Sequence, residues 1–249
     1  MVKKENHNNF IPVVIPSYEP DQRLLDLLKN LISEKLTNIL IIDDGSASSY
    51  QSIFQEAKKI GARVIHHKIN LGKGAALKTA FSYCMENIQD FIGLVTADSD
   101  GQHTPRAIGD VMERLWCASD SLVLGSRDFD LPNVPEKSRI GNVGTNMIIK
   151  VLYNKTLKDT QTGLRGIPKS FIPDLLELKG NRFEYEMQML QCAFINNINI
   201  EEVPIETVYD SRENHATHFR PIKDTLEIYK VFGIPRAFLA LLRCKMSKK

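Results

Sequence analysis

The sequence predicts one α/β domain in which helices flank a twisted, mostly parallel β-sheet. Short runs of β-branched residues alternate with segments of helical periodicity through the first half of the chain. Small, polar or charged residues follow these runs, as is typical where parallel strands end at a binding edge. The 249 residues fit one large domain, and no internal repeat divides them.

Five apolar runs predict the strands. Each is short and rich in Val, Ile or Leu, which is typical of a strand buried on both faces of a sheet. The runs are Phe10–Ile15, Ile39–Ile42, Arg63–His66, Phe91–Thr96 and Ser121–Leu124. We expect these buried strands to run parallel, joined by right-handed crossovers. A further strand is expected at Asn199–Tyr209.

Helical spacing of apolar residues marks the segments between the strands. It occurs in Leu24–Ile32, Ile53–Ile60 and Ile108–Leu115. Two later helices are expected over Ser138–Tyr153 and Pro221–Phe232. The first would carry Arg139, Asn142, Asn146 and Lys150 along one face. The polar, proline-interrupted segment Asp128–Lys137 is expected to form a mobile loop.

The composition excludes several classes of protein. With 43% hydrophobic and 25% charged residues, the chain is neither disordered nor fibrous. No apolar run approaches the roughly 18 residues of a membrane span, and the polar N-terminus lacks the apolar core of a secretory signal. The four cysteines form no CxxC pair, which indicates packing residues in a reducing compartment. We therefore expect a cytoplasmic protein.

Two carboxylates after the fourth run indicate a metal site. Asp98 and Asp100 are separated by one residue, and like charges so close are costly unless a cation neutralises them. Carboxylates, waters and substrate phosphates are the ligands that suit Mg²⁺ or Mn²⁺. An acidic turn that caps the helix near Thr104 is the alternative interpretation. The position after a buried strand, beside other polar strand ends, favours the metal site.

The second and third strand ends indicate a nucleotide site. Asp43 and Asp44 follow a strand directly, where an acid can accept from a base or a ribose hydroxyl. An Asp-Gly turn with a serine helix cap would explain the same residues. Gly72-Lys73-Gly74 precedes a helix, whose N-terminus favours anions. Leu77 stands where a dinucleotide fingerprint needs its last glycine, which disfavours a dehydrogenase.

These motifs together resemble glycosyltransferase family 2, and within it the branch of dolichol-phosphate mannose synthase and its bacterial polyprenyl-phosphate relatives. In order, the motifs are PSYE from Pro16, DDGS from Asp43, NLGKG from Asn70, DSDGQH from Asp98, GSR from Gly125, DTQTGLR from Asp159, FEYEM from Phe183 and HFRP from His218. The resemblance spans residues 12–232. It implies the GT-A fold, a nucleotide-sugar donor, a divalent metal, Mg²⁺ or Mn²⁺, and inversion at the anomeric carbon.

The resemblance also implies roles for individual residues. Metal binding would fall to Asp98, Asp100 and Gln102. Contact with the nucleotide sugar would fall to Pro16, Tyr18, Glu19, Asp43, Asp44, Gly72, Lys73, Asp98 and Arg127, with Asp44 on the base. Contact with the acceptor would fall to Arg139, Arg165, His218 and Arg220. Asp100, Arg127 and Arg139 are the expected catalytic residues. Ser99, where relatives often have Ala, is expected to matter little.

The acceptor decides whether the reaction needs a base. A sugar hydroxyl must lose a proton during attack, whereas a polyprenyl phosphate is already anionic and needs only cations to hold it. The arginines of the later motifs favour the lipid phosphate, although each alone also fits a solvated surface position. Glu184 and Glu186 are the candidate bases, and their helical spacing lets at most one reach the site.

Three other functions compete with this interpretation. Transfer to a saccharide hydroxyl during polysaccharide synthesis is the nearest enzymatic alternative. A nucleotidyltransferase would carry a glycine-rich loop after the first strand, where this chain has PSYEP. A non-catalytic nucleotide-binding protein would not need both Asp98 and Asp100. The motifs leave the donor base, the sugar and the oligomeric state open.

The last fourteen residues form a basic tail. Of the 32 cations, five lie in Arg236–Lys249, which has no acid, so residues 1–235 carry 27 cations against 30 acids. We expect residues 1–235 to form the catalytic domain and 236–249 to form a membrane-surface helix, placing the enzyme peripherally on the inner face of the membrane. A helix packed on the body with a frayed basic end is the alternative.

Overall fold

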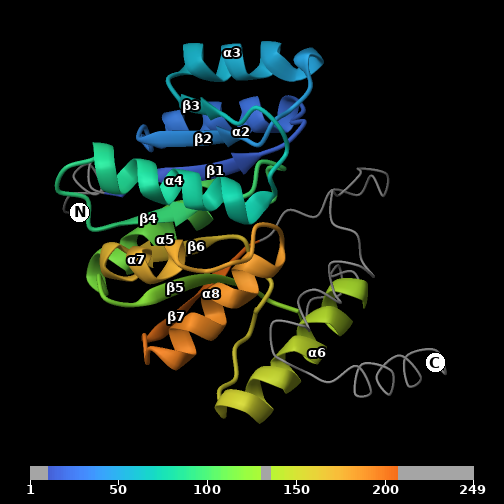
Figure 1. Ribbon diagram of the computed structural model, residues 1–249, viewed down its shortest axis with the longest axis vertical. Helices are drawn as coiled ribbons and strands as arrows, with labels where there is room; N and C mark the ends of the chain where they lie inside the picture. Colours follow the sequence, from blue (N-terminus) through green and yellow to red (C-terminus); the bar gives the residue numbers. More distant parts are fainter. Residues whose placement is uncertain (1–10, 130–135, 207–249) are drawn as a thin grey trace.

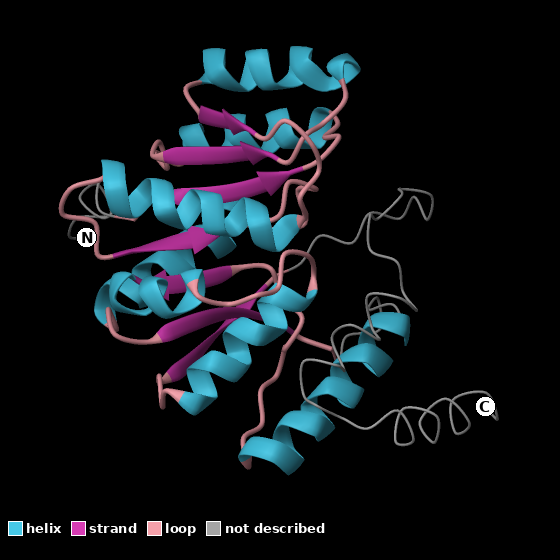
Figure 2. Ribbon diagram, in the orientation of Figure 1, coloured by secondary structure: helices cyan, strands magenta, loops and turns pink. Residues whose placement is uncertain are grey.

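The computed structural model describes residues 11–129 and 136–206, and a seven-stranded sheet is the centre of this part of the chain. Its strands are β1 (Val13–Ser17), β2 (Ile39–Asp43), β3 (Arg63–His66), β4 (Gly93–Thr96), β5 (Leu122–Arg127), β6 (Arg165–Pro168) and β7 (Ile200–Ile205). The α-helices are α2 (Gln22–Ser33), α3 (Gln51–Ile60), α4 (Lys73–Asn87), α5 (Pro105–Cys117), α6 (Glu136–Tyr153), α7 (Ile172–Leu176) and α8 (Glu184–Ile195). Figures 1 and 2 show helices on both faces of the sheet, which confirms the predicted fold class.

The strand order is β3-β2-β1-β4-β6-β5-β7. The pairs β1–β2, β2–β3, β1–β4 and β5–β7 are parallel, as the sequence predicts. Strand β6 is antiparallel to both β4 and β5, between which it lies. The parallel strands β1 to β4 therefore end at one edge of the sheet, the side on which α6 stands in Figure 1.

Each face of the sheet buries its own apolar core. Along β1 and β2 the side chains alternate: Val14 and Leu40 pack with α4 and α8 on one face, whereas Val13, Ile15 and Ile41 pack with α2 and α5 on the other. This alternation is the period of two that an extended chain imposes. Burial on both faces explains why the strands read as continuous apolar runs.

Local signals place the helices between the strands. Helix α2 begins after Asp21, whose carboxylate accepts from the backbone N–H of Arg23, and its buried leucines form one stripe. Helix α5 begins after Thr104, whose hydroxyl accepts from Ala107 N at 3.1 Å, with a proline at the first helical position. Helix α3 ends at Gly61, whose φ of 119° is left-handed.

The structure corrects several of the predicted elements. Strand β3 is at the sheet edge, and Arg63 and His66 are exposed, so it is not the fully buried strand that we expected. Strand β5 continues to Arg127, three residues past the apolar run. Helix α6 begins at Glu136, so the expected loop ends two residues before Lys137. The loop's residues 130–135 lie outside the described part of the chain.

The second half of the chain departs further from the prediction. Strand β6 was not anticipated, because its sequence RGIP contains a glycine and a proline. The predicted strand at Asn199–Tyr209 corresponds to β7 over its described residues. Of the cysteines, Cys84 is buried, and burial raises its pKa to about 12, but Cys117 is exposed and not a packing residue. The helix expected at Pro221–Phe232 and the basic tail lie outside the described residues.

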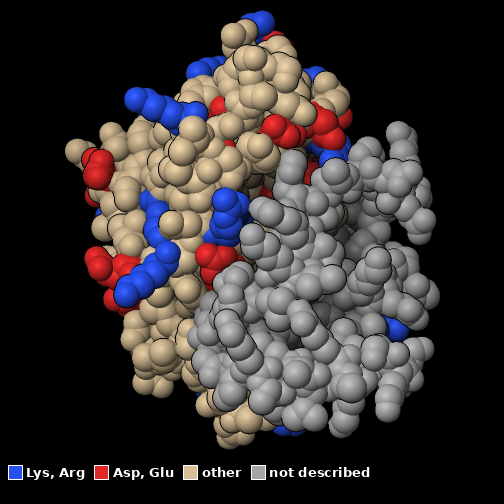
Figure 3. All heavy atoms as spheres, turned by 45° about the vertical axis from the view of Figure 1, so that its right-hand side comes forward, with Lys and Arg blue, Asp and Glu red and all other residues tan. Residues whose placement is uncertain are grey.

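Among residues 11–129 and 136–206, no helix is long and apolar enough to cross a bilayer. Figure 3 shows one face of the molecule, and on its described part acidic and basic side chains are interspersed rather than separated into patches of one sign. A broad basic surface of the kind that binds nucleic acid is therefore not present on that part.

Candidate functional site

The site lies at the edge of the sheet where the parallel strands end. Ser17, Asp43 and His66 close β1, β2 and β3, and their strands pair in register up to these residues. The turn after β4 carries Asp98 and Asp100, and β5 ends at Arg127. The fold therefore brings together residues that are far apart in the sequence, as the strand-end argument predicts.

The turn after β2 is built around Asp43, which is 1% exposed. Its carboxylate accepts from Ser46 N at 2.8 Å, from the His66 ring at 2.8 Å and from Gln51 Nε2 at 3.2 Å. Burial raises the pKa of Asp43, but these hydrogen bonds outweigh it and leave the pKa below its ordinary value. Asp43 thus holds the turn in place from a buried position, and its carboxylate is not exposed for direct contact with a nucleotide.

Asp44, which is 2% exposed, holds the loop before α4. One carboxylate oxygen accepts from Leu71 N at 2.9 Å and pairs with the His67 ring at 2.8 Å, and the other accepts from Gly72 N at 2.8 Å. These contacts occupy the carboxylate that we expected on the base. In this arrangement Asp44 orders one wall of the predicted nucleotide site.

The residues of the PSYE motif border this wall. Pro16 is buried inside β1, opposite Ile42. Glu19 has a left-handed φ of 49°, and its N–H donates to Ser46 Oγ at 2.8 Å. Burial and the neighbouring carboxylates of Glu19 and Asp44 raise the pKa of Tyr18. The turn therefore places Tyr18 and Glu19 beside Asp44.

The glycines of Gly72-Lys73-Gly74 serve close packing. A Cβ on Gly72 would lie 2.3 Å from Asn181 O, and one on Gly74 would lie 2.5 Å from Tyr185 Cβ. The N–H of Ala75 donates to Asn181 O at 3.0 Å. At least one backbone N–H at the start of α4, which we expected to favour an anion, is therefore already bonded to the segment before α8.

Lys73 connects this helix to the acidic turn. Its Nζ lies 2.6 Å from Asp98 Oδ1 and 3.0 Å from Glu186 Oε1. Burial lowers the pKa of Lys73, but the two carboxylates outweigh it and raise the pKa well above its ordinary value. Lys73 is therefore a permanently charged lysine between two acids of the site. The sequence predicts contact between Lys73 and the nucleotide sugar, and it gives no sign of this pairing.

The turn after β4 presents oxygen ligands at the same place. Burial raises the pKa of Asp98, but Lys73 and His103 lower it to about 2. Burial and the charge of Asp98 raise the pKa of Asp100, whose Oδ1 accepts from Gln102 N at 3.0 Å. The buried His103 braces the turn by accepting the N–H of Asp98 at 3.2 Å, a role that we did not predict.

These residues fit a divalent metal ion. Within the described residues no Lys or Arg forms an ion pair with Asp100, so its carboxylate is available to a cation. No group of three acids, histidines or cysteines that could hold a metal occurs in the same part of the chain. A cation held by Asp98 and Asp100 would therefore take further ligands from water and phosphate oxygens, which Mg²⁺ and Mn²⁺ accept readily.

Gly163 forms the floor beneath Asp98. Its carbonyl accepts from Thr96 Oγ1 at 2.8 Å, and a Cβ on it would lie 2.3 Å from Asp98 Oδ2. Gly163→Ala is expected to displace the Asp98 carboxylate and weaken Mn²⁺ binding about tenfold or more. Calorimetric titration with Mn²⁺ measures the change. In the matched control, Gly109→Ala, a Cβ meets nothing within 4 Å, so its Mn²⁺ affinity should stay at the wild-type value.

The three arginines predicted for this site have different surroundings. Arg127 binds the fully buried Asp159 through Nε at 2.6 Å and Nη2 at 3.1 Å. Arg139 is exposed, and its Nε donates to Phe129 O at 2.9 Å. Arg165 is 1% exposed and donates to the carbonyls of Thr162 and Glu186 at 2.9 and 2.6 Å. Arg165 therefore supports the site from inside, which contradicts its predicted contact with an acceptor.

The candidate bases also separate as expected. Glu186 faces the site through its pair with Lys73, whereas Glu184 accepts from Asn181 N and Arg182 N in the turn that precedes α8. Sequence reasoning missed the role of Asp159, although it opens the DTQTGLR motif. His218 and Arg220 lie outside the described residues.

Comparison with known proteins gives a family match and two similar relatives. The sequence profile described as "Glycosyl transferase family 2" matches residues 13–176. The chain is 32% identical over 219 residues to an uncharacterised protein of Methanocaldococcus jannaschii, covering 84% of this chain and 88% of the relative. It is 31% identical over 220 residues to UDP-N-acetylglucosamine–dolichyl-phosphate N-acetylglucosaminyltransferase of Methanococcus voltae, covering 81% of this chain and 87% of the relative.

A solved structure shares the fold. Glucosyl-3-phosphoglycerate synthase from Mycobacterium tuberculosis, in complex with Mn²⁺, UDP-glucose and phosphoglyceric acid, superposes with a TM-score of 0.64 at 15% identity. The superposition covers 90% of this chain and 80% of the synthase.

Proposed function

We propose that this chain, which belongs to glycosyl transferase family 2 and has the GT-A fold, moves a sugar from a nucleotide sugar to a polyprenyl phosphate with inversion at the anomeric carbon. That the chain is a glycosyltransferase follows from its family. The observation that carries the choice of acceptor is the pairing of Glu186 with Lys73. The acid that faces the site is held by a lysine and is not a free base.

The donor end of the reaction rests on Asp98 and Asp100. We propose that these carboxylates hold Mg²⁺ or Mn²⁺, as the Mn²⁺ complex of the mycobacterial synthase suggests for this fold. When bound, the ion supplies positive charge to the diphosphate as it leaves. The wall made by Tyr18, Glu19 and the loop that Asp44 holds would receive the nucleoside.

The acceptor end needs cations more than it needs a base. An oxygen of the lipid phosphate forms the new bond to the anomeric carbon from the face opposite the donor phosphate. The bond from that carbon to the donor's phosphate oxygen breaks, and its electron pair leaves with the nucleoside diphosphate. No proton is removed, because the phosphate oxygen is already anionic. Arg139, which we expected on the acceptor, is one cation that we assign to this phosphate. We also assign Arg127 to it, although the resemblance implies contact with the nucleotide sugar, because Phe129 contacts both arginines.

The remaining proposals concern place and extent. Residues 1–235 would form the catalytic domain, and the basic segment 236–249 would hold the enzyme on an anionic membrane surface, where its lipid acceptor lies. We propose a cytoplasmic enzyme at the inner face of the membrane. The relative from Methanococcus voltae, named for a dolichyl-phosphate acceptor, supports this choice of substrate.

A panel of labelled donors tests the proposal. Purified protein with Mn²⁺ or Mg²⁺ and a polyprenyl phosphate is mixed with UDP-N-acetylglucosamine, UDP-glucose or GDP-mannose in turn. We expect label in the organic phase with at least one donor, and none when the matched polyprenol without phosphate replaces the acceptor. Label on an added saccharide, with none on the lipid, would instead establish the hydroxyl-acceptor alternative.

A further inference from the structure

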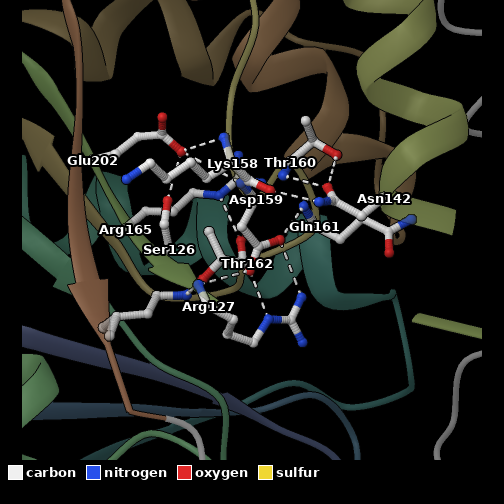
Figure 4. A network of polar contacts seen from close by, with 11 residues as sticks. Ser126, Arg127, Asn142, Lys158, Asp159, Thr160, Gln161, Thr162, Arg165 and Glu202 are labelled. Atoms are coloured by element: carbon white, nitrogen blue, oxygen red, sulfur yellow. Dashed lines mark hydrogen bonds and ion pairs between the residues drawn. The ribbon is translucent and has the colours of Figure 1, made fainter. Parts of the chain in front are cut away.

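Asp159 is the most deeply buried acid of the site and has no part in the reaction derived above. It is 0% exposed, and its two oxygens bind the guanidinium of Arg127 side by side at 2.6 and 3.1 Å. A two-point contact between planar groups fixes the orientation of an arginine as well as its charge. Figure 4 shows the pair at the centre of a polar network.

The network connects this pair to α6 through one side chain. Asn142 of α6 is 4% exposed; its Nδ2 donates to Lys158 O, and its Oδ1 accepts from Thr160 N at 3.0 Å and Thr160 Oγ1 at 2.9 Å. Asn142 therefore bonds to the backbone of both residues that flank Asp159, Lys158 and Thr160, as Figure 4 shows. Both the donor and the acceptor of its amide are used, which no other residue type of this size can reproduce.

Glu202 of β7 holds the same segment from the opposite side. Its Oε1 accepts from Lys158 N at 2.7 Å and from Ser126 Oγ at 2.6 Å. Ser126 directly precedes Arg127 on β5, so the strand that carries the arginine and the segment that carries its partner share one carboxylate. The position of Asp159 is thus fixed from β5, β7 and α6 at once.

Phe129 brings a second arginine into this arrangement. The guanidinium carbon of Arg127 lies 5.1 Å from the centre of the Phe129 ring, and the Phe129 carbonyl accepts from Arg139 Nε at 2.9 Å. Arg139 stands on α6, one turn before Asn142. The two arginines that we assign to the lipid phosphate therefore share Phe129 as a neighbour. In addition, the helix that carries Arg139 is bonded through Asn142 to the segment that carries Asp159, the partner of Arg127.

We propose that Asp159 and Asn142 are positioning residues that hold Arg127 and Arg139 as one clamp for the acceptor phosphate, an inference that rests on the proposed function. Asp159 sets the orientation of Arg127. Asn142 sets the distance of α6, and with it Arg139, from the Asp159 segment. Neither residue has to touch the substrate for its loss to weaken the acceptor contact, because a displacement of about 1 Å at a binding group can lower a rate a hundredfold.

Asn142→Ala should raise KM for a short-chain polyprenyl phosphate about tenfold or more, while KM for the nucleotide sugar stays within about twofold. The matched control is Asn146→Ala. Asn146 stands one turn further along α6, and its Oδ1 accepts from Leu157 N at 3.1 Å, so it makes the same kind of bond to the same connecting segment but to neither direct neighbour of Asp159. Asn146→Ala should leave both KM values unchanged, and an equal rise in acceptor KM would overturn the proposal.

A double-mutant cycle tests whether Asp159 acts through Arg127. Asp159→Asn should raise the acceptor KM in the wild-type background and have no further effect in an Arg127→Ala background, because the group it orients is gone. Additive effects would show that Asp159 serves only stability. If wild-type protein transfers no sugar to any polyprenyl phosphate, the proposed function fails instead, so the two failures are distinguishable.

Discussion

Asp100→Asn is expected to lower kcat for sugar transfer by roughly a hundredfold to a thousandfold, the cost of losing one electrostatic contact to developing charge. Asp100 and Asp98 are the oxygen ligands that we assign to the metal ion. The substitution keeps the size of the side chain and its acceptor for Gln102 N, now 3.0 Å away, while removing the negative charge. Steady-state rates at saturating donor and acceptor measure the loss.

The same substitution should not destabilise the metal-free protein. Burial and the charge of Asp98 raise the pKa of Asp100 above its unfolded value, so its ionised form opposes folding, and this cost grows as pH rises past the unfolded pKa. At pH 7 the asparagine removes that cost. Thermal unfolding in EDTA should therefore give a Tm equal to or above that of the wild type, and the rise in Tm on adding Mn²⁺ should disappear.

Ser99→Ala is the matched control, because it changes the residue between the two acids without altering charge. It should keep the wild-type rate and the wild-type response to Mn²⁺. The metal assignment is wrong if Asp100→Asn keeps its rise in Tm with Mn²⁺. Lost activity together with a lowered Tm in EDTA would point to damaged folding and contradict the charge argument.

The first half of the fold follows from local patterns, and the second half does not. Apolar runs, helical periodicity and helix caps predict several elements to within a few residues of their ends, namely β1, β2, β4, α2 and α5. Strand β6 depends instead on pairing with β4 and β5, which lie far from it in sequence. A strand of four residues with a glycine and a proline has no local propensity to reveal it.

The site shows the same division. Chain order and strand ends predict which residues gather at the sheet edge, because parallel strands must end together. They do not predict which charges pair. The Lys73–Asp98 contact joins residues 25 apart in sequence, and Glu186 reaches Lys73 from a helix on a distant segment. A buried arginine such as Arg165 and an exposed one such as Arg139 look alike in a sequence, since burial depends on packing that no local pattern records.

Lys73→Met is expected to lower the Tm of the metal-free protein by about 6–12 °C. The substitution removes the cation that lies 2.6 Å from Asp98 and 3.0 Å from Glu186 and leaves two carboxylates close together without it. Removal of one partner from a buried pair costs about 3–5 kcal/mol. Asp98 keeps 31% of its side chain exposed, so we expect about 3 kcal/mol, the lower end of this range.

A divalent ion should compensate for this loss. In the wild type Lys73 already neutralises Asp98, so a metal ion held by Asp98 must compete with the ammonium group. Without Lys73 that competition is absent, and Mn²⁺ should bind more tightly and raise Tm further than in the wild type. Differential scanning fluorimetry over a range of Mn²⁺ concentrations gives both quantities without measuring turnover.

Two further variants isolate the cause. Lys78→Met changes another lysine of α4, whose Nζ donates to Leu178 O at 2.7 Å and Asn181 Oδ1 at 2.9 Å, and it should leave the response to Mn²⁺ unchanged. Glu186→Gln in the Lys73→Met background removes one of the two unpaired carboxylates and should restore part of the lost Tm. The substitution removes the repulsion between the carboxylates of Glu186 and Asp98, and Asp98 still has no competing lysine. The rise in Tm with Mn²⁺ should therefore remain larger than in the wild type. An equal response in wild type and Lys73→Met would show that Lys73 and the metal ion do not share Asp98.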